Sequence, residues 1–381
     1  MRVTSRTWSA SLGWSQALPA VADDVQLILS FGPVESPSIE WFDEVQHHWP
    51  TAQHVYCSGG GQITDGVVQD DDVVLTTVHF DGAAVHPVVR DGVDVVNSTD
   101  AGERIGAELA KVSGLRHVLV FAEGLALDAA SFVAGMNTML PADVQVTGGL
   151  ASNGIALSRT SVGLNGPPAS GRVVAIGLSG ESLVVGTGSV GGWEFFGPER
   201  VVTRAGMSEV FELDGERALD VYKRYLGEFA KELPGSALLF PLAVRSSRDG
   251  PVAVRTILAI DDAAGSMRFA GNIPEGSIAR LMRTTTDRLI DGAGQAAEHA
   301  GGPTTTSASS LTLCISCIGR RAVMRSRVDE EIEEVIRVTG GNSTVVGFYS
   351  NGEIAPPTDG REHARAVLHN QTMTITTLSE R

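Results

Sequence analysis

Three short loops carry the side chains whose types and spacing could do chemistry. Each begins with a serine after an apolar run and continues into glycine: Ser58-Gly59-Gly-Gly, Ser152-Asn153-Gly154 and Ser350-Asn351-Gly352-Glu353. Hydroxyls, amides and exposed backbone N–H groups are the means by which proteins hold small polar molecules. We therefore expect the loops, with Tyr349 beside the third, to form a binding site for a small polar ligand.

A hydrolase acting on a small amide or acyl substrate is an alternative interpretation of the same serines. A nucleophilic serine needs a neighbouring base. No lysine lies in any of the three loops, and none has the G-x-S-x-G pattern. Ser-x-Gly turns also occur for structural reasons alone, because glycine adopts positive φ and serine caps backbone amides. Ligand binding suits these loops better than hydrolysis.

Charged residues suggest what the ligand would be. Arg245 and Arg255 follow neighbouring strand patterns, Leu-Ala-Val-Arg and Val-Ala-Val-Arg, and Glu353 lies in the third loop. A guanidinium can hold a carboxylate in a bidentate pair, and Glu353 can receive an ammonium group. Together these groups would suit a zwitterion such as an amino acid. An internal Arg–Glu salt bridge explains the same residues equally well.

No metal site or obligatory cofactor is predicted. The nine histidines lack the spacings of zinc sites. Haem held by a single axial histidine is an alternative, because one ligand leaves no spacing pattern. Cys314 and Cys317 form a C-x-x-C within an alternating strand pattern, where positions i and i+3 face opposite ways, so we expect core cysteines.

The elements that position the loops follow one repeated order. Apolar runs begin at Val25, His117 and Leu311, and each leads into a helical pattern, a second strand, the serine loop and a closing strand. The serines follow these starts by 33, 35 and 39 residues. We expect an α/β fold of two domains, with mixed sheets built from divergent strand–helix–strand–loop–strand repeats.

Apolar periodicity predicts further helices, and a strand-rich region lies in the middle of the chain. The helices are expected to begin near Asp100, Glu216 and Ser277, with another at 328–338 whose acidic first turn includes Glu331. Strand patterns separated by Gly or Pro run from 182 to 260, and we place a domain boundary near Asp214-Gly215.

Composition limits the class of protein. The chain has 381 residues, a net charge of −16 and only three lysines. An acidic surface repels phosphate backbones, so nucleic acid is not an expected partner. No stretch of 18 apolar residues or signal peptide is evident, and three cysteines do not suit a disulfide framework. We expect a soluble, cytoplasmic protein that does not enter membranes.

Two regions resemble a known family. Val346-Gly-Phe-Tyr-Ser-Asn-Gly-Glu-Ile-Ala-Pro356, with Leu368 to Leu378 and Cys317-Ile-Gly-Arg-Arg321, is similar to the FIST C domain, and Val55-Tyr-Cys-Ser58 and Gly148 to Gly154 resemble FIST N. The resemblance implies an N-terminal segment at 1–24, a FIST N-like domain at 25–214 and a FIST C-like domain at 215–381. The first loop departs from it, since Gln62 stands where related loops carry an acidic residue.

FIST proteins are regarded as sensory input modules of signal transduction that bind small ligands such as amino acids. The resemblance therefore implies a non-catalytic sensor without its own output domain, acting on a signalling partner such as a histidine kinase. Some members are haem-based nitric oxide sensors, which makes that the second interpretation. The sensing region would include residues of the third loop and one beyond it, namely Tyr349, Ser350, Asn351, Gly352, Glu353 and Asn370.

Overall fold

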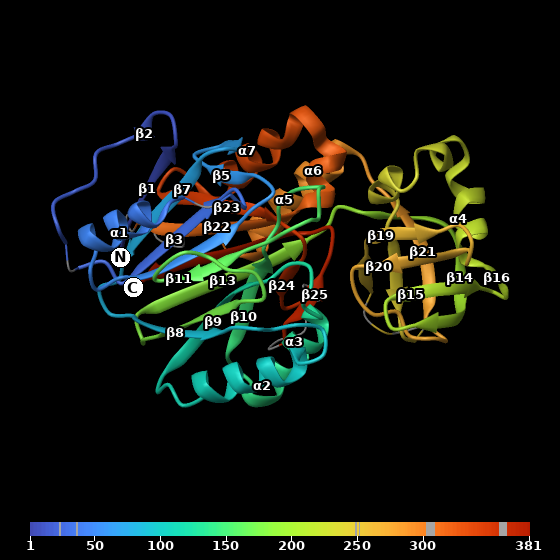
Figure 1. Cartoon of the computed structure of the whole chain (residues 1–381), viewed down its shortest axis with the longest axis horizontal. Coiled ribbons are helices and arrows are strands. Elements are labelled where there is room, and N and C mark those ends of the chain that lie inside the picture. The colour runs from blue at the N-terminus through green and yellow to red at the C-terminus, as the bar shows by residue number, and fades with distance from the viewer. Residues whose placement is uncertain (23, 36, 248–249, 251, 302–308, 358–363) are drawn as a thin grey trace.

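The computed structural model describes residues 1–22, 24–35, 37–247, 250, 252–301, 309–357 and 364–381. Within these residues the chain forms a larger body, on which both termini lie, and a smaller body beside it (Figure 1). The smaller body comprises the elements from β14 to β21, which are inserted between strand β13 and helix α5 of the larger body.

The larger body repeats one unit three times. Each unit has two parallel strands joined by a helical crossover, a closing strand antiparallel to the first of them, and an outer strand beyond it. The strand orders are β4-β3-β7-β1, β10-β9-β12-β8 and β23-β22-β26-β13. This common order confirms the predicted α/β fold of repeated units, in which helices join parallel strands.

The bounds of the repeated elements follow the predicted periodicity closely. The first unit contains β1 (Arg2–Ser9), β3 (Leu27–Gly32), α1 (Ile39–His48), β4 (Gln53–Ser58) and β7 (Val73–His79). The second contains β8 (Ala84–Arg90), α2 (Ser98–Leu109), β9 (Leu115–Ala122), α3 (Ala129–Met139), β10 (Gln145–Leu150) and β12 (Val173–Ser179). The third contains β13 (Leu183–Val190), α5 (Thr286–His299), β22 (Ser310–Cys317), α6 (Ile318–Met324), α7 (Val328–Thr339), β23 (Ser343–Ser350) and β26 (Met373–Glu380).

Short strands that follow the serine loops are exchanged between the units. Strand β5 (Gln62–Thr64) pairs with β23 of the third unit, β24 (Glu353–Ala355) with β10 of the second, and β11 (Val162–Leu164) with β4 of the first. Each unit thus gives one strand and receives one. Further short strands extend the sheets, namely β2 (Gly13–Trp14), β6 (Val67–Gln69) and β25 (Val367–His369).

The core lies where the three sheets face one another. Phe31, Phe121 and Phe348 meet there, with ring centroids 4.9 Å apart for Phe31 and Phe348 and 5.9 Å apart for Phe31 and Phe121. Along β3, Leu27 and Leu29 face this core, while Ile28 packs with the residues of α1. Both faces of the strand are therefore buried, which explains why its sequence is apolar apart from Ser30 and Gly32.

The smaller body is one curled sheet with a helix packed on it. Its edge strands are consecutive in sequence, separated by Thr256, so the sheet must bend until they adjoin. Asp214 and Gly215, where the domain boundary is expected, lie in a turn within this sheet. The elements are β14 (Glu194–Gly206), β15 (Glu209–Leu213), β16 (Glu216–Arg217), α4 (Ala218–Leu226), β17 (Leu242–Arg245), β18 (Ala253–Arg255), β19 (Ile257–Asp261), β20 (Ser266–Phe269) and β21 (Ile278–Arg283).

One local prediction of secondary structure was wrong. The helix expected to open at Ser277 is strand β21, which pairs with β14 and β17, and α5 begins after Thr285 caps it. Helical propensity yields to tertiary pairing at β21. The helix expected near Asp100 is α2, which starts two residues earlier at Ser98, and Asp100 lies in its first turn and pairs with Arg104. Within the 1–24 segment, strand β1 lies in the first sheet.

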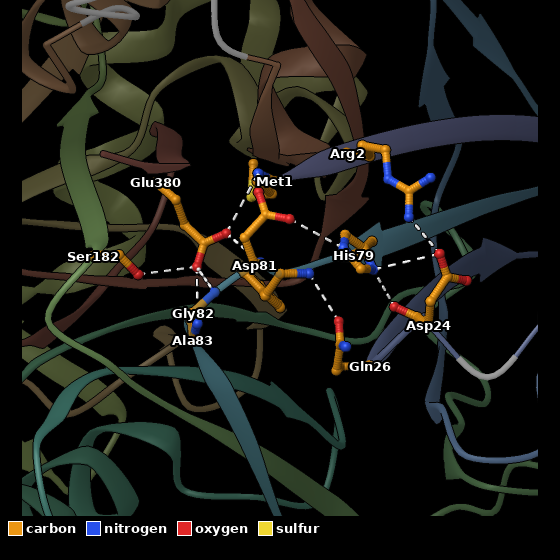
Figure 2. A network of polar contacts seen from close by, with 11 residues as sticks. Met1, Arg2, Asp24, Gln26, His79, Asp81, Gly82, Ala83, Ser182 and Glu380 are labelled. Carbon is orange, nitrogen blue, oxygen red and sulfur yellow. Dashed lines mark hydrogen bonds and ion pairs between the residues drawn. The ribbon is translucent and has the colours of Figure 1, made fainter.

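The connections between the units meet around Glu380 (Figure 2). Its carboxylate accepts hydrogen bonds from the backbone N–H groups of Asp81, Gly82 and Ala83, at 2.6, 2.8 and 2.8 Å, and from the Ser182 hydroxyl at 3.1 Å. Burial alone would raise the pKa of Glu380, but these hydrogen bonds outweigh it and lower the pKa. One carboxylate therefore joins the start of the second unit, the start of the third and the end of the third.

Replacing Glu380 by Ala should lower the free energy of unfolding by ~2–4 kcal/mol, because several backbone donors lose a charged acceptor. Since the folded pKa of Glu380 is lowered, its contribution is present at neutral pH and is lost as pH falls through that value. Urea unfolding at pH 7 and pH 4 measures both effects. The exposed Glu181→Ala variant is the control, and an equal loss in the two variants would contradict the assignment.

Candidate functional site

The three serine loops meet at the centre of the larger body. Ser58 and Ser350 end β4 and β23, and Ser152 follows β10 by two residues. The Ser152 N–H donates to the Ser58 carbonyl at 2.8 Å, and the Ser152 hydroxyl donates to Asn351 Oδ1 at 2.7 Å. Gly60 N–H donates to the Tyr349 carbonyl at 2.8 Å. Strand exchange thus gathers loops from all three units in one place.

Each serine hydroxyl is buried and holds a structural hydrogen bond. Ser58 Oγ accepts from the Ser161 N–H at 3.1 Å, and Ser350 Oγ donates to Glu353 Oε1 at 2.7 Å. Among the hydrogen bonds of these hydroxyls in the described part of the chain, none involves histidine or lysine. The described geometry therefore offers these hydroxyls no base of that kind.

The remaining loop residues shape the turns. Gly59 packs against Phe348 so closely that an added Cβ would lie 2.8 Å from the Phe348 Cβ. The Gly154 N–H donates to Ser152 Oγ at 3.1 Å, and Asn153 Nδ2 donates to Ser158 Oγ at 2.7 Å. Asn153 is partly exposed, so of the second loop it lies nearer to solvent than Ser152.

Glu353 is the most perturbed acidic group of the cluster. It begins β24, is fully buried, and accepts hydrogen bonds from Ser350 Oγ, from Thr372 Oγ1 at 3.0 Å and from the Thr372 N–H at 3.2 Å. Burial raises the pKa of Glu353 to about 7, although these hydrogen bonds and one from Cys317 favour the charged form. The carboxyl therefore changes protonation near neutral pH.

Arg255 and the turn after β25 bring the two bodies together beside strand β24, which Glu353 begins. Arg255 Nη1 lies 3.4 Å from the Leu368 carbonyl, and Gln371 Nε2 donates to Thr256 Oγ1 at 3.1 Å. Desolvation lowers the pKa of Arg255 to about 10. Three buried polar atoms here have no hydrogen-bond partner within the described chain: Arg255 Nε, Asn370 Oδ1 and Gln371 Oε1.

Arg245 does not join this cluster, contrary to the sequence-based expectation. In the β17–β18 pair, Leu242 lies opposite Arg255, so Arg245 is displaced along the strand by three residues, or ~10 Å. It forms an ion pair with Glu199 and lines a cavity of about 30 Å³ with Phe195 and Arg280. Neighbouring strands therefore carry the two arginines to different places.

A second buried network adjoins the third loop and was missed from the sequence. Glu331 Oε2 accepts from Arg320 Nη2 at 2.7 Å, and Glu331 Oε1 accepts from the Tyr349 hydroxyl at 2.5 Å and from Ser316 Oγ at 2.9 Å. Arg320 also donates to the carbonyls of Gly191, at 2.6 Å, and Leu289, at 2.8 Å. Both charged side chains are fully buried.

The burial of Glu331 could have been predicted from the apolar pattern of α7. Val328, Ile332 and Val335 form the buried face of that helix, and Glu331, three residues after Val328, lies on the same face. The sequence predicts only its place in an acidic first turn, which is where it lies. A charged residue on an apolar face predicts a buried partner, which here is Arg320.

Buried histidines do not point to a metal centre in this part of the structure. His54 hydrogen-bonds Ser30 at 2.9 Å, His117 hydrogen-bonds Thr147 at 2.8 Å, and His369 hydrogen-bonds the Ala355 carbonyl at 3.1 Å. Burial lowers their pKa values to about 3, 3 and 4, so each ring is neutral at pH 7. The described residues contain no group of three or more potential metal ligands.

Comparison with known proteins identifies the class. Residues 26–216 match the FIST N domain and residues 218–356 match the FIST C domain, so most of the chain has the domain pair of a sensory protein. The chain therefore belongs to the FIST family, whose domains are sensory signalling domains. No curated protein matches it, and no helix in the described residues is long and apolar enough to cross a membrane.

Solved structures of two enzymes show distant similarity. A chorismatase is 10% identical over 99% of this chain and 98% of its own, with a TM-score of 0.33. A cyanuric acid hydrolase from A. caulinodans is 9% identical over 100% of this chain and 99% of its own, with a TM-score of 0.36.

Replacing Glu331 by Gln should lower the free energy of unfolding by ~3–5 kcal/mol, because Arg320 would remain buried without a counter-charge. Glu334→Gln on the same helix is the matched control, since its partner Arg337 is exposed and such pairs contribute ~0–1 kcal/mol. Guanidinium unfolding of both variants measures the difference. Equal losses of unfolding free energy in the two variants would show that the buried pair contributes no more to stability than the exposed pair.

Glu353 should make stability depend on pH in an unusual direction. Its folded pKa of about 7 lies above the ordinary 4.5, so native protein holds a proton that unfolded protein has lost. The free energy of unfolding should therefore fall by up to ~3 kcal/mol between pH 4.5 and pH 7, and Glu353→Gln should remove this fall. Urea unfolding across that range tests it, with exposed Glu333→Gln retaining the wild-type slope.

Proposed function

We propose that this FIST protein is a cytoplasmic sensory input protein that binds a small zwitterion, such as an amino acid, at the junction of its two bodies. Arg255 would hold the carboxylate. Glu353, Asn370 and Gln371 would receive the ammonium group. The observation that carries this proposal is the set of unpartnered buried atoms on both sides of the junction, Arg255 Nε facing from the smaller body and two amide oxygens from the larger.

Energetics supports a ligand at this place. A buried polar group without a partner costs ~1–3 kcal/mol, and native proteins keep few of them. Arg255 Nε is a donor, whereas Asn370 Oδ1 and Gln371 Oε1 are acceptors. A molecule with an anionic acceptor at one end and a cationic donor at the other would satisfy all three. The serine loops beneath them would set the position of Asn351 and Glu353.

A signal would arise from the two links between the bodies, residues 191–193 and 284–285. Trp193 Nε1 donates to the Gln371 carbonyl at 2.8 Å, and Arg320 holds the Gly191 carbonyl. A ligand that contacts both bodies would favour one arrangement of them and shift its population. The changed surface would act on a signalling partner, with a histidine kinase as the expected kind.

Arg255→Gln should weaken binding of the amino acid by at least tenfold, because a charge-assisted hydrogen bond contributes ~1.5–3 kcal/mol. Thermal-shift and calorimetric titration with the twenty common amino acids would measure it. Arg245→Gln is the matched control: it removes the same group from the neighbouring strand and should leave affinity unchanged. Equal affinity of both variants for the amino acid would refute the site. A haem-sized mass on the purified protein would favour the haem sensor instead.

A further inference from the structure

The two fully buried glutamates near the third loop differ in what balances their charge. Glu331 has the guanidinium of Arg320 at 2.7 Å. Glu353 contacts neutral donors, namely Ser350, Thr372 and the Cys317 thiol, and forms no ion pair within the described residues. A buried carboxylate without a cation is unfavourable, so Glu353 either holds a proton or requires a cation from outside the chain.

Among the described titratable groups around the third loop and the junction, Glu353 is the one whose protonation changes near neutral pH. His369 lies opposite it in the β24–β25 pair, and burial lowers the pKa of His369 to about 4. Burial and the Glu353 charge raise the pKa of Cys317 well above its usual range. Arg255, across the junction, has a pKa of about 10. Between pH 5.5 and pH 8.5 these three groups keep one protonation state.

We infer that the ligand places its cationic group against Glu353 and that binding expels the proton which this carboxyl carries in the free protein. This deepens the proposed function and rests on it. The O–H bond of the Glu353 carboxyl breaks, the proton passes to solvent, and the carboxylate is left paired with the ligand's ammonium group. No oxidant, reductant or other reactant takes part.

Only one of the three repeated units carries a carboxyl at the position from which the proton would be expelled. Glu353, Gln62 and Val162 are the first residues of the three exchanged strands, and they lie opposite Gly149, Phe348 and Cys57. Those three partners in turn pair with Phe121, Ile315 and Phe31 on the first strand of each unit, so the positions are equivalent. One carboxyl among three equivalent positions predicts one ligand and at most one proton.

The equivalence also supplies the test variant. Gln62 shows that this fold accommodates a buried glutamine at the corresponding place, so Glu353→Gln exchanges the residue for one that the first unit already carries. The probes are the twenty common amino acids and the 2-hydroxy acids that carry hydroxyl in place of ammonium. Full-length protein is titrated by calorimetry at pH 6, 7 and 8, each in two buffers of different ionisation enthalpy.

The wild-type protein should release ~0.9 proton per amino acid at pH 6 and ~0.1 at pH 8, and affinity should rise about tenfold between these pH values. The direction follows because the amino acid pairs with the ionised carboxyl, which becomes more abundant as pH rises. Glu353→Gln should release no proton and show flat affinity. The hydroxy acids should bind without proton release.

Several results would overturn the inference. Amino acids that bind with heats independent of buffer would refute proton expulsion while leaving the proposed function standing. Hydroxy acids that bind as tightly, with the same proton release, would refute the cation contact. Failure of all twenty amino acids to bind would overturn the proposed function itself. If Glu353→Gln does not fold, the buffer dependence of the wild-type heats decides the question alone.

Discussion

Short strands that leave one unit to complete the sheet of another are the constraint on which the larger body depends. Buried N–H and C=O groups must be paired, and β5, β11 and β24 find partners on β23, β4 and β10. The chain must therefore cross between units directly after each second parallel strand. This crossing fixes three serine loops at one place, where side chains from every unit meet.

The same interior holds charge in two contrasting ways. The Arg320–Glu331 pair is complete within the fold, with hydroxyl and carbonyl partners around it, so it is a structural support. At the junction, neither Arg255 nor Glu353 forms an ion pair within the described residues, although the charge of Asp128 acts on Arg255, and Arg255 Nε has no hydrogen-bond partner there. A protein shaped for stability alone would pair or replace them. Perturbed and unpaired groups of this kind are concentrated at functional sites.

Sequence patterns predicted what local physics determines. Apolar runs such as Leu27 to Phe31 and the periodic helix at 328–338 appear as expected, and the similar spacing of the three serines indicated the repeat. Three-residue strands such as β24 carry too little periodicity to be predicted, and their pairing depends on residues far away in the sequence, as Glu353 pairs with Gly149. For the same reason Arg245 was misplaced and the burial of Glu331 was not predicted, because register and burial are set by tertiary partners.

The position of the junction explains how a binding event there would reach the rest of the protein. Trp193, in one of the two links, holds the backbone of Gln371, and Gly191 in the same link is held by Arg320. Arg320 is joined through Glu331 to Tyr349, which precedes the Ser350–Glu353 loop. The 191–193 link is therefore held at Gly191 and at Trp193 by elements that carry the proposed ligand contacts. A cation against Glu353 and a carboxylate against Arg255 would act on the two bodies at once, and the link must respond to their relative position.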